Sequence, residues 1–330
     1  MRVQGRFTTL FSRCAALVAS VFILGLAPSA QANESIKVQA LTFPVVVNGT
    51  THLMAGKLYT HGSARNRPLQ ILVHGATYTG DYWDLPSVDG QPHSYARYMA
   101  RQKYAVLALD QLGNGASDTP EGFGLTLGAM ADAAAQVAQQ MRSGNNGVGI
   151  AFDQIVFVGH SMGSMVGIRA QAEQHPFDAL VTTAMGHVPH PLPPLPDFCA
   201  GNTTGYFYFP EMIRAVLLFA PQYVTPEMFG YDSATFNEPI SCGFLYTGLV
   251  GTYDLAQTKV DQVTGPALVQ LSEIDIVAPS ELADQEAAFW PQADVTVQTL
   301  PQVGHSVNAS IGAQPSWERI DAWLTGVLAK

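Results

Sequence analysis

Charge is scarce in this sequence. Asp, Glu, Lys and Arg make up only 13% of its 330 residues, while hydrophobic residues make up 47% and aromatic residues 10%. A disordered chain shows the opposite balance, so the composition indicates a folded protein. Basic residues are the scarcest, with 16 Lys and Arg against 26 Asp and Glu, and they form no run. Because binding to nucleic acid requires a basic surface, the composition argues against nucleic acid as a partner.

Long apolar runs are also missing, except near the N-terminus. There, three arginines within residues 1–13 precede an apolar stretch, 14–27, and the small-x-small tripeptide Ala-Gln-Ala ends at Ala32. The stretch has about 14 residues, whereas a membrane-spanning helix needs roughly 20. The pattern is typical of a secretory signal peptide that is cleaved after Ala32. We therefore expect residues 1–32 to be removed; an uncleaved membrane anchor is the alternative.

Removal of this segment sets the expectations for residues 33–330. It leaves 13 basic residues against 26 acidic ones, a net charge of −13. We expect this part of the chain to be acidic, to lack a stable membrane anchor, and to be secreted or periplasmic. No pattern in it predicts an oligomeric state.

Cysteine is rare as well. Cys14 lies in the predicted signal peptide, which leaves only Cys199 and Cys242. An even pair of cysteines in an oxidising compartment favours one disulfide. We predict that these two residues form it; two free buried thiols are the alternative.

Motifs for metals and cofactors are missing too. The histidines lack the spacing of a metal site. The pair Gly113-x-Gly115 lacks the third glycine of a dinucleotide-binding fingerprint. We therefore expect neither a metal nor a cofactor.

From Ile36 onward, β-branched runs alternate with helical patterns, which favours an α/β fold with a mostly parallel sheet flanked by helices. A hairpin is expected across Asn48-Gly49, a strong turn signal. The expected strands are 36–47, 52–59, 69–74, 105–109, 154–158, 179–184, 267–271 and 295–300. The expected helices are 93–103, 127–142, 162–174 and 316–328.

The alternation stops between residues 187 and 265. Five prolines within 189–196 open this segment, and neither a helix nor a central strand tolerates them. The segment is too long for a simple loop, so we interpret it as an inserted cap that contains both remaining cysteines. Its basic residues are few, chiefly Arg214 and Lys259. Its apolar side chains could form its own small core or face a substrate; they are Tyr206, Phe207, Tyr208, Phe209, Phe219, Tyr223, Met228 and Phe229.

The strongest chemical signal is Gly159-His-Ser161-Met-Gly163, which follows an apolar run and precedes a helical pattern. A serine in this strand–turn–helix context is a nucleophile elbow, in which the glycines give room for a sharp turn. The helix that follows directs free N–H groups toward developing negative charge. We therefore predict that Ser161 is a nucleophile and that the Met162 N–H helps to bind an oxyanion.

A second signal is the strand end Val-His74-Gly75-Ala76. The N–H of Ala76 is expected to donate to the same oxyanion as that of Met162. We interpret His74 as a structural histidine that is bonded to nearby backbone. It is not expected to be the catalytic base.

Three motifs in this order resemble the α/β-hydrolase superfamily. They are His74-Gly75, then Asp110-x-x-Gly113-x-Gly115-x-Ser117-Asp118, and then the elbow around Ser161. The resemblance covers nearly all of residues 33–330 and implies a single α/β-hydrolase domain with the cap inserted at about 187–265. It also implies that the acid and the histidine of a catalytic triad follow the nucleophile in the chain. The Asp110 motif is interpreted as architectural.

The resemblance selects His305 as the general base, since Val-Gly-His305-Ser lies between the last expected strand and the last helix. Other histidines near or after the nucleophile are less suitable; His160 is expected to point away along the elbow. Asp275 is the expected acid, because its segment resembles the acid loop of this family, in which an Asp lies a few residues past a strand and upstream of a proline. Glu273, two residues earlier, is its competitor.

The sequence thus predicts an exported serine esterase with Ser161, His305 and Asp275 as its triad. Neutral, hydrophobic acyl or aromatic esters of short to medium length are the expected substrates. A serine at the elbow argues against dehalogenase and epoxide-hydrolase chemistry. Amidase or peptidase, carbon–carbon hydrolase and cofactor-free haloperoxidase activities remain open on the same triad. A non-catalytic binding protein on this fold is the alternative from another class.

Overall fold

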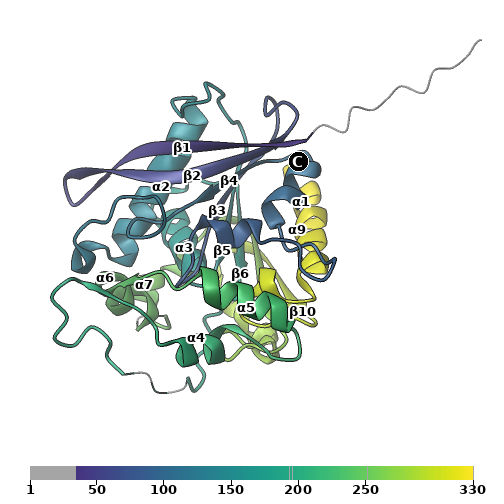
Figure 1. The fold of residues 1–330 in the computed structure, drawn as a ribbon. Helices are drawn as coiled ribbons and strands as arrows, with labels where there is room; N and C mark the ends of the chain where they lie inside the picture. The colour runs from purple at the N-terminus through teal and green to yellow at the C-terminus, as the bar shows by residue number, and fades with distance from the viewer. Residues whose placement is uncertain (1–34, 193, 195, 251, 330) are drawn as a thin grey trace, which may run out of the picture. The chain divides into compact units, whose positions relative to one another are not determined.

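The computed structural model describes residues 35–192, 194, 196–250 and 252–329 (Figure 1). The predicted signal peptide, residues 1–32, lies outside this described part. Among the described residues, no helix combines the length and the apolar character needed to cross a membrane.

An eight-stranded sheet forms the centre of the described part (Figure 1). Its spatial order is β1-β2-β4-β3-β5-β6-β9-β10. The pairs β1–β2 and β2–β4 are antiparallel, and all the others are parallel. The strands are β1 (Ile36–Val47), β2 (Thr50–His61), β3 (Leu69–Val73), β4 (Ala105–Leu109), β5 (Ile155–His160), β6 (Ala179–Thr183), β9 (Gly265–Ser272) and β10 (Ala293–Leu300). The mostly parallel α/β sheet predicted from the sequence is confirmed.

The β1–β2 hairpin turns at Asn48 and Gly49, which have φ angles of 51° and 76°. A two-residue turn with both φ angles positive matches the twist of the flanking strands, and Asn-Gly adopts it readily. The hairpin expected from the sequence is therefore confirmed.

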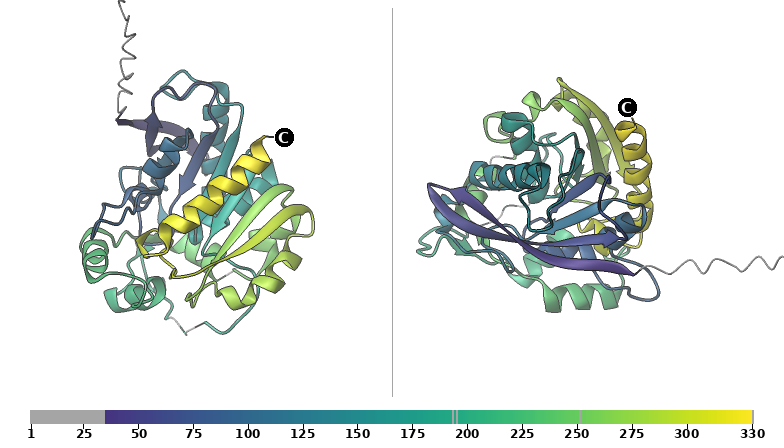
Figure 2. Two further views of the ribbon diagram at one scale, coloured as in Figure 1. Left: turned by 90° about the vertical axis from the view of Figure 1, so that its right-hand side faces the viewer. Right: turned by 90° about the horizontal axis from the view of Figure 1, so that it is seen from above.

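Helices cover both faces of the sheet. Helices α2 (Leu127–Ser143) and α3 (Met162–Gln174) pack on one face, whereas α1 (Tyr95–Arg101) and α9 (Ala313–Leu328) pack on the other. Figure 2 shows α9 lying across its face of the sheet. Because the inner strands are buried on both sides, they are mostly apolar rather than alternating. Their polar residues include Gln70 of β3 and Gln270 of β9.

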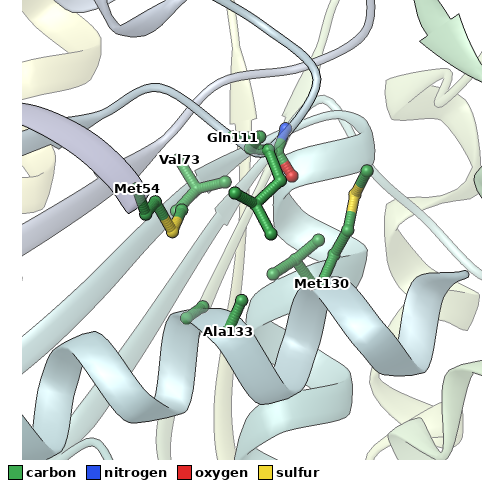
Figure 3. Close-up of a pocket in the computed structure, with 8 residues that line it drawn as sticks. Met54, Val73, Gln111, Met130 and Ala133 are labelled. Atoms are coloured by element: carbon green, nitrogen blue, oxygen red, sulfur yellow. The ribbon is translucent and has the colours of Figure 1, made fainter. Parts of the chain in front are cut away.

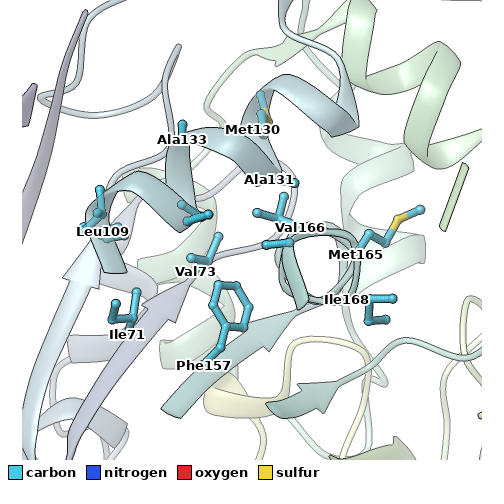
Figure 4. Packing of buried hydrophobic residues seen from close by; sticks show 14 of the residues in the cluster. Ile71, Val73, Leu109, Met130, Ala131, Ala133, Phe157, Met165, Val166 and Ile168 are labelled. Atoms are coloured by element: carbon cyan, nitrogen blue, oxygen red, sulfur yellow. The ribbon is translucent and has the colours of Figure 1, made fainter. Parts of the chain in front are cut away.

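Alternate residues of the inner strands point into the two hydrophobic cores, one on each face of the sheet. Ile71 and Val73 of β3 pack toward α2 and α3 (Figure 4), whereas Leu72 belongs to the cluster with α1 and α9. The packing beneath α2 is tight. The gap among Met54, Val73, Gln111, Met130 and Ala133 has no room for a water molecule (Figure 3).

The predicted insertion lies between β6 and β9, which end at Thr183 and begin at Gly265; we call residues 184–264 the insertion. It contains short elements that gather along the lower side of Figure 1. These are α4 (Glu211–Leu218), α5 (Pro226–Thr235), α6 (Cys242–Phe244), α7 (Leu255–Thr258), a π-helical turn (Leu245–Leu249), and the strand pair β7 (Tyr206–Phe207) and β8 (Ile240–Ser241).

A disulfide joins Cys199 to Cys242 within the insertion, with the two Cα atoms 5.8 Å apart. It ties the segment that follows the prolines to the start of α6. Both cysteines are buried. The bond therefore holds together two parts of the insertion that are 43 residues apart in sequence.

Replacing both cysteines (Cys199→Ala/Cys242→Ala) is expected to destabilise the insertion more than the sheet. Closing a loop of this length contributes up to about 4 kcal/mol in the chain-entropy model of disulfides. Denaturant unfolding of the wild type and the double variant measures the loss. Intact-mass analysis of the purified wild-type protein is the control, and two free thiols in it would contradict this prediction.

Candidate active site

Ser161 sits in the turn between β5 and α3, with φ of 51° and ψ of −120°. A non-glycine residue with positive φ is uncommon and marks a strained turn. Glycine is required on both sides. A Cβ on Gly159 would lie 2.5 Å from the Cα of Ser164, and one on Gly163 would lie 2.2 Å from the carbonyl oxygen of Val73. The turn is therefore built as the elbow motif predicts.

His305 lies in the loop between β10 and α9 and faces Ser161. Its Nε2 is 2.9 Å from the Ser161 Oγ. Its Nδ1 is 2.9 Å and 3.0 Å from the two carboxylate oxygens of Asp275, which lies just past the end of β9. His305 is 3% exposed and the Asp275 side chain 0%. Three loops thus bring serine, histidine and carboxylate into one hydrogen-bonded chain, in which the histidine and the carboxylate are buried.

Glu273, the competing carboxylate, has a different environment. It is exposed, and its Oε2 accepts the N–H of Gln302 at 2.7 Å. Asp275 instead accepts the N–H of Val277 through Oδ1, at 2.8 Å, in addition to its contact with His305. Glu273 organises the neighbouring loop, and of the two carboxylates only Asp275 contacts the histidine.

His160 is the residue whose placement was predicted wrongly. Its side chain does not point away from the site, because its Nε2 lies 2.8 Å from the carbonyl oxygen of His305. Burial, reinforced by the nearby His305 ring, holds the pKa of His160 well below its ordinary value. The ring is therefore neutral, and Nε2 must carry the proton, because it donates a hydrogen bond to the carbonyl oxygen of His305. The ring also stacks on Tyr82, with centroids 4.4 Å apart, so His160 supports the histidine loop from behind.

His74 has backbone partners on both ring nitrogens. Its Nδ1 donates to the carbonyl oxygen of Gly75 at 2.8 Å, and its Nε2 accepts the N–H of Gln111 at 3.1 Å. Burial lowers its pKa, so the ring stays neutral. Asp110 likewise accepts backbone N–H groups, those of Gly80 and Ala116. These bonds connect the loops after β3 and β4.

A cavity of about 460 Å³ opens beside Ser161 and His305. Ala76 and Met162 also line it, so both expected oxyanion donors border the same space as Ser161. Met162 begins helix α3, where backbone N–H groups have no acceptor within the helix. The cavity therefore combines the serine with groups suited to stabilise negative charge.

The insertion supplies most of the cavity wall, which is apolar. The residues from the insertion are Leu192, Pro196, Asp197, Phe198, Phe209, Leu217, Leu218, Leu245, Tyr246, Leu249 and Val250. Of the eight apolar side chains considered in the sequence analysis, only Phe209 is among them. Phe207 stacks on Phe198 instead, and Phe219 packs against Phe229. The wall is mostly aliphatic, and its leucines form no pattern in the sequence that distinguishes them from a core.

Within the described ranges, no group of three His, Cys, Asp or Glu side chains lies close enough to hold a metal ion. The basic and acidic side chains that line the cavity are His305 and Asp197, and the hydroxyl of Tyr246 donates to the Asp197 carboxylate at 3.0 Å. The arrangement can therefore deliver a serine oxygen, accept its proton and bind an apolar molecule.

The sheet order, the two helical layers and the strand–turn–helix at Ser161 together define an α/β-hydrolase fold. A model of the alpha/beta hydrolase family matches residues 70–315, and the chain belongs to this family.

Solved structures share the fold at low sequence identity. A thermophilic esterase from Thermogutta terrifontis has a TM-score of 0.61 and 17% identity, over 88% of this chain and 99% of the esterase. Est1E from Butyrivibrio proteoclasticus, with ferulic acid bound, has a TM-score of 0.55 and 16% identity, over 87% of this chain and 100% of Est1E. An N-formylmaleamic acid deformylase from Pseudomonas putida S16 has a TM-score of 0.51 and 19% identity, over 87% and 99%. No curated protein matches the chain significantly.

Proposed function

We propose that this protein is an exported serine hydrolase that cleaves carboxylic esters. The observation that carries the proposal is the hydrogen-bonded chain from Ser161 through His305 to Asp275 at the wall of an apolar cavity. A nucleophile in contact with a base, itself oriented by a third group, is the arrangement that nucleophilic catalysis requires. Membership of the alpha/beta hydrolase family supports the same reaction class.

In the first half of the proposed reaction, Ser161 attacks the ester carbonyl while His305 takes the serine proton. Asp275 holds the Nδ1–H of His305 and stabilises the imidazolium that forms. The N–H groups of Ala76 and Met162 bind the oxyanion of the tetrahedral intermediate. His305 then donates its proton to the leaving alcohol, and an acyl group remains on Ser161.

In the second half, water takes the place of the alcohol. His305 removes a proton from the water as it attacks the acyl carbon, and the same two N–H groups bind the second oxyanion. Collapse of this intermediate releases the carboxylic acid, and the proton returns to Ser161. Every proton transfer uses His305, so the proposal needs no metal or cofactor.

We expect neutral, hydrophobic esters of short to medium length to be the best substrates. The cavity wall is largely aliphatic, and the charged group that the insertion adds to it is the carboxylate of Asp197. A net charge near −13 on residues 33–330 further disfavours anionic substrates. A hydrolysis screen measures kcat/KM for p-nitrophenyl butyrate and hexanoate against phosphorylated, dicarboxylate and sugar esters. A preference for any of the polar esters would contradict this expectation.

The reaction class needs its own test, because fold alone does not establish an activity. A fluorophosphonate probe labels an activated serine covalently, so labelling of Ser161, located by peptide mapping, supports a serine hydrolase. A binding protein on this fold would remain unlabelled. Parallel assays with amide analogues of the best ester distinguish an esterase from an amidase.

A further inference from the structure

Arg214 and Asp232 form a fully buried ion pair inside the insertion, between α4 and α5. Nη2 of Arg214 contacts Oδ1 of Asp232, and both side chains are 0% exposed. Taking two charges out of water is costly, and well-packed apolar residues often give equal or better stability at such a position. Stability alone therefore does not explain the pair, which indicates a role that apolar side chains could not perform.

Arg214 reaches the loop that carries the expected oxyanion donor. Its Nε donates to the Oγ1 of Thr77 at 3.0 Å, and its guanidinium carbon lies 5.3 Å from the ring centroid of Tyr78. Thr77 directly follows Ala76 and has a φ of 68°. Positive φ is a strained conformation for a β-branched residue and persists only where its surroundings enforce it. The bond from Arg214 is one of the contacts that hold Thr77, and through it the N–H of Ala76.

Asp232 is connected through Tyr78 to the loop that carries His305. Its Oδ2 accepts the hydroxyl proton of Tyr78 at 2.9 Å, and the Tyr78 oxygen lies 2.9 Å from the Oγ of Ser306. Because the Tyr78 proton points to the carboxylate, the Ser306 hydroxyl donates to Tyr78. Ser306 directly follows His305, and its N–H donates to the carbonyl oxygen of Leu218 at the end of α4, at 2.8 Å. The loop that carries His305 is thus bonded directly to α4 and, through Tyr78, to Asp232 of α5.

We propose that Arg214 and Asp232 are positioning residues. Through Thr77 and Tyr78 they fix the loop after β3, which carries Ala76, relative to the loop after β10, which carries His305. The inference rests on the proposed function, since it concerns the geometry of the same reaction. The pair does not line the cavity and touches neither Ser161 nor the expected substrate. Its effect is therefore on the transition state rather than on substrate binding.

The central experiment replaces the pair by apolar residues of similar size, Arg214→Met/Asp232→Leu. Removing both charges together avoids leaving one buried charge unpaired, so the variant is expected to fold. A displacement of catalytic groups by about 1 Å costs on the order of 10²-fold in rate. We expect kcat for p-nitrophenyl butyrate to fall about 10²-fold, with KM within about threefold of the wild type. Affinity for a trifluoromethyl ketone, which mimics the tetrahedral intermediate, should fall in parallel with kcat.

A second pair of variants tests the contact itself and does not require the ion pair to be removed. Thr77→Val deletes the acceptor of Arg214 but keeps the shape, and it should lower kcat by about tenfold with KM little changed. Thr77→Ser keeps the hydroxyl and should retain most of kcat. Arg142→Met is the matched control, because it breaks an ion pair with Asp178 at the opposite end of the sheet and should leave kcat unchanged.

The outcomes separate this inference from the proposed function. A wild-type protein that neither hydrolyses esters nor reacts with the fluorophosphonate overturns the proposed function and, with it, this inference. An active wild type whose folded Arg214→Met/Asp232→Leu variant keeps kcat within threefold overturns the inference alone. Equal losses of kcat in Thr77→Ser and Thr77→Val would also overturn it, since they would show that the hydrogen bond from Arg214 does not position the loop that carries Ala76.

Discussion

Ser161→Ala is expected to lower kcat for ester hydrolysis by about 10⁶-fold while leaving the fold intact. The substitution removes only the Oγ that lies 2.9 Å from Nε2 of His305. The turn itself is set by Gly159, Gly163 and the tight packing around them, which alanine does not disturb. The assay is hydrolysis of p-nitrophenyl butyrate by purified variants, with circular dichroism and thermal unfolding to check the fold.

Two further variants make this test specific. Combining Ser161→Ala with His305→Ala should cost little more than either change alone, because residues that act as a unit in catalysis have non-additive effects. Ser164→Ala is the matched control: its Oγ donates to the carbonyl oxygen of Thr183, and it takes no part in the chain to His305. Activity within tenfold of the wild type in Ser161→Ala would refute the proposed mechanism.

The sheet was largely predictable because its strands carry strong local signals. Strands β3 and β4 are buried on both faces and are short, mostly apolar runs in the sequence, and the Asn48-Gly49 turn fixes the first hairpin. All eight strands of the sheet lie within about two residues of their expected bounds. Local pattern and tertiary burial agree in these elements, which is the condition under which sequence reasoning succeeds.

The insertion was less predictable, because its elements are short and depend on tertiary contacts. Helix α4 has eight residues, and its face toward the cavity is recognisable only once the opposite wall is known. Leu217 lines the cavity, whereas Arg214, three residues earlier, is buried against Thr77. A hydrophobic pattern does not predict that an arginine is buried, and it does not separate a core from a binding wall.

The candidate site likewise has a part that the sequence predicts and a part that it does not. Ser161, His305 and Asp275 each sit in a local motif, and the structure brings them within hydrogen-bond distance, although their catalytic roles stay a prediction. The residues behind them were missed or placed wrongly. Tyr78 and Ser306 are 228 positions apart, and His160 and His305 are 145 apart. Contacts between residues so far apart produce no recognisable motif or spacing in the sequence, so only the fold reveals them.

Asp275→Asn is expected to lower kcat by up to about 10⁴-fold, since the carboxylate selects the tautomer of the histidine. Oδ1 of Asp275 accepts the N–H of Val277 at 2.8 Å, and an asparagine oxygen can keep this bond. The asparagine NH₂ then replaces Oδ2, which lies 2.9 Å from Nδ1 of His305. Nδ1 must therefore accept a hydrogen bond instead of donating one, and the proton of the neutral ring moves to Nε2. In that tautomer His305 cannot accept the proton of Ser161.

Glu273→Gln is the matched control for this prediction, since it makes the same chemical change two residues away. Glu273 is exposed, and a glutamine oxygen can still accept the N–H of Gln302. We expect its kcat to stay within about tenfold of the wild type, because no bond to His305 is altered. Steady-state kinetics of the two variants at one pH decide between the carboxylates. A larger loss in Glu273→Gln than in Asp275→Asn would assign the acid to Glu273 and would mean that the loop after β9 holds the histidine in a different register.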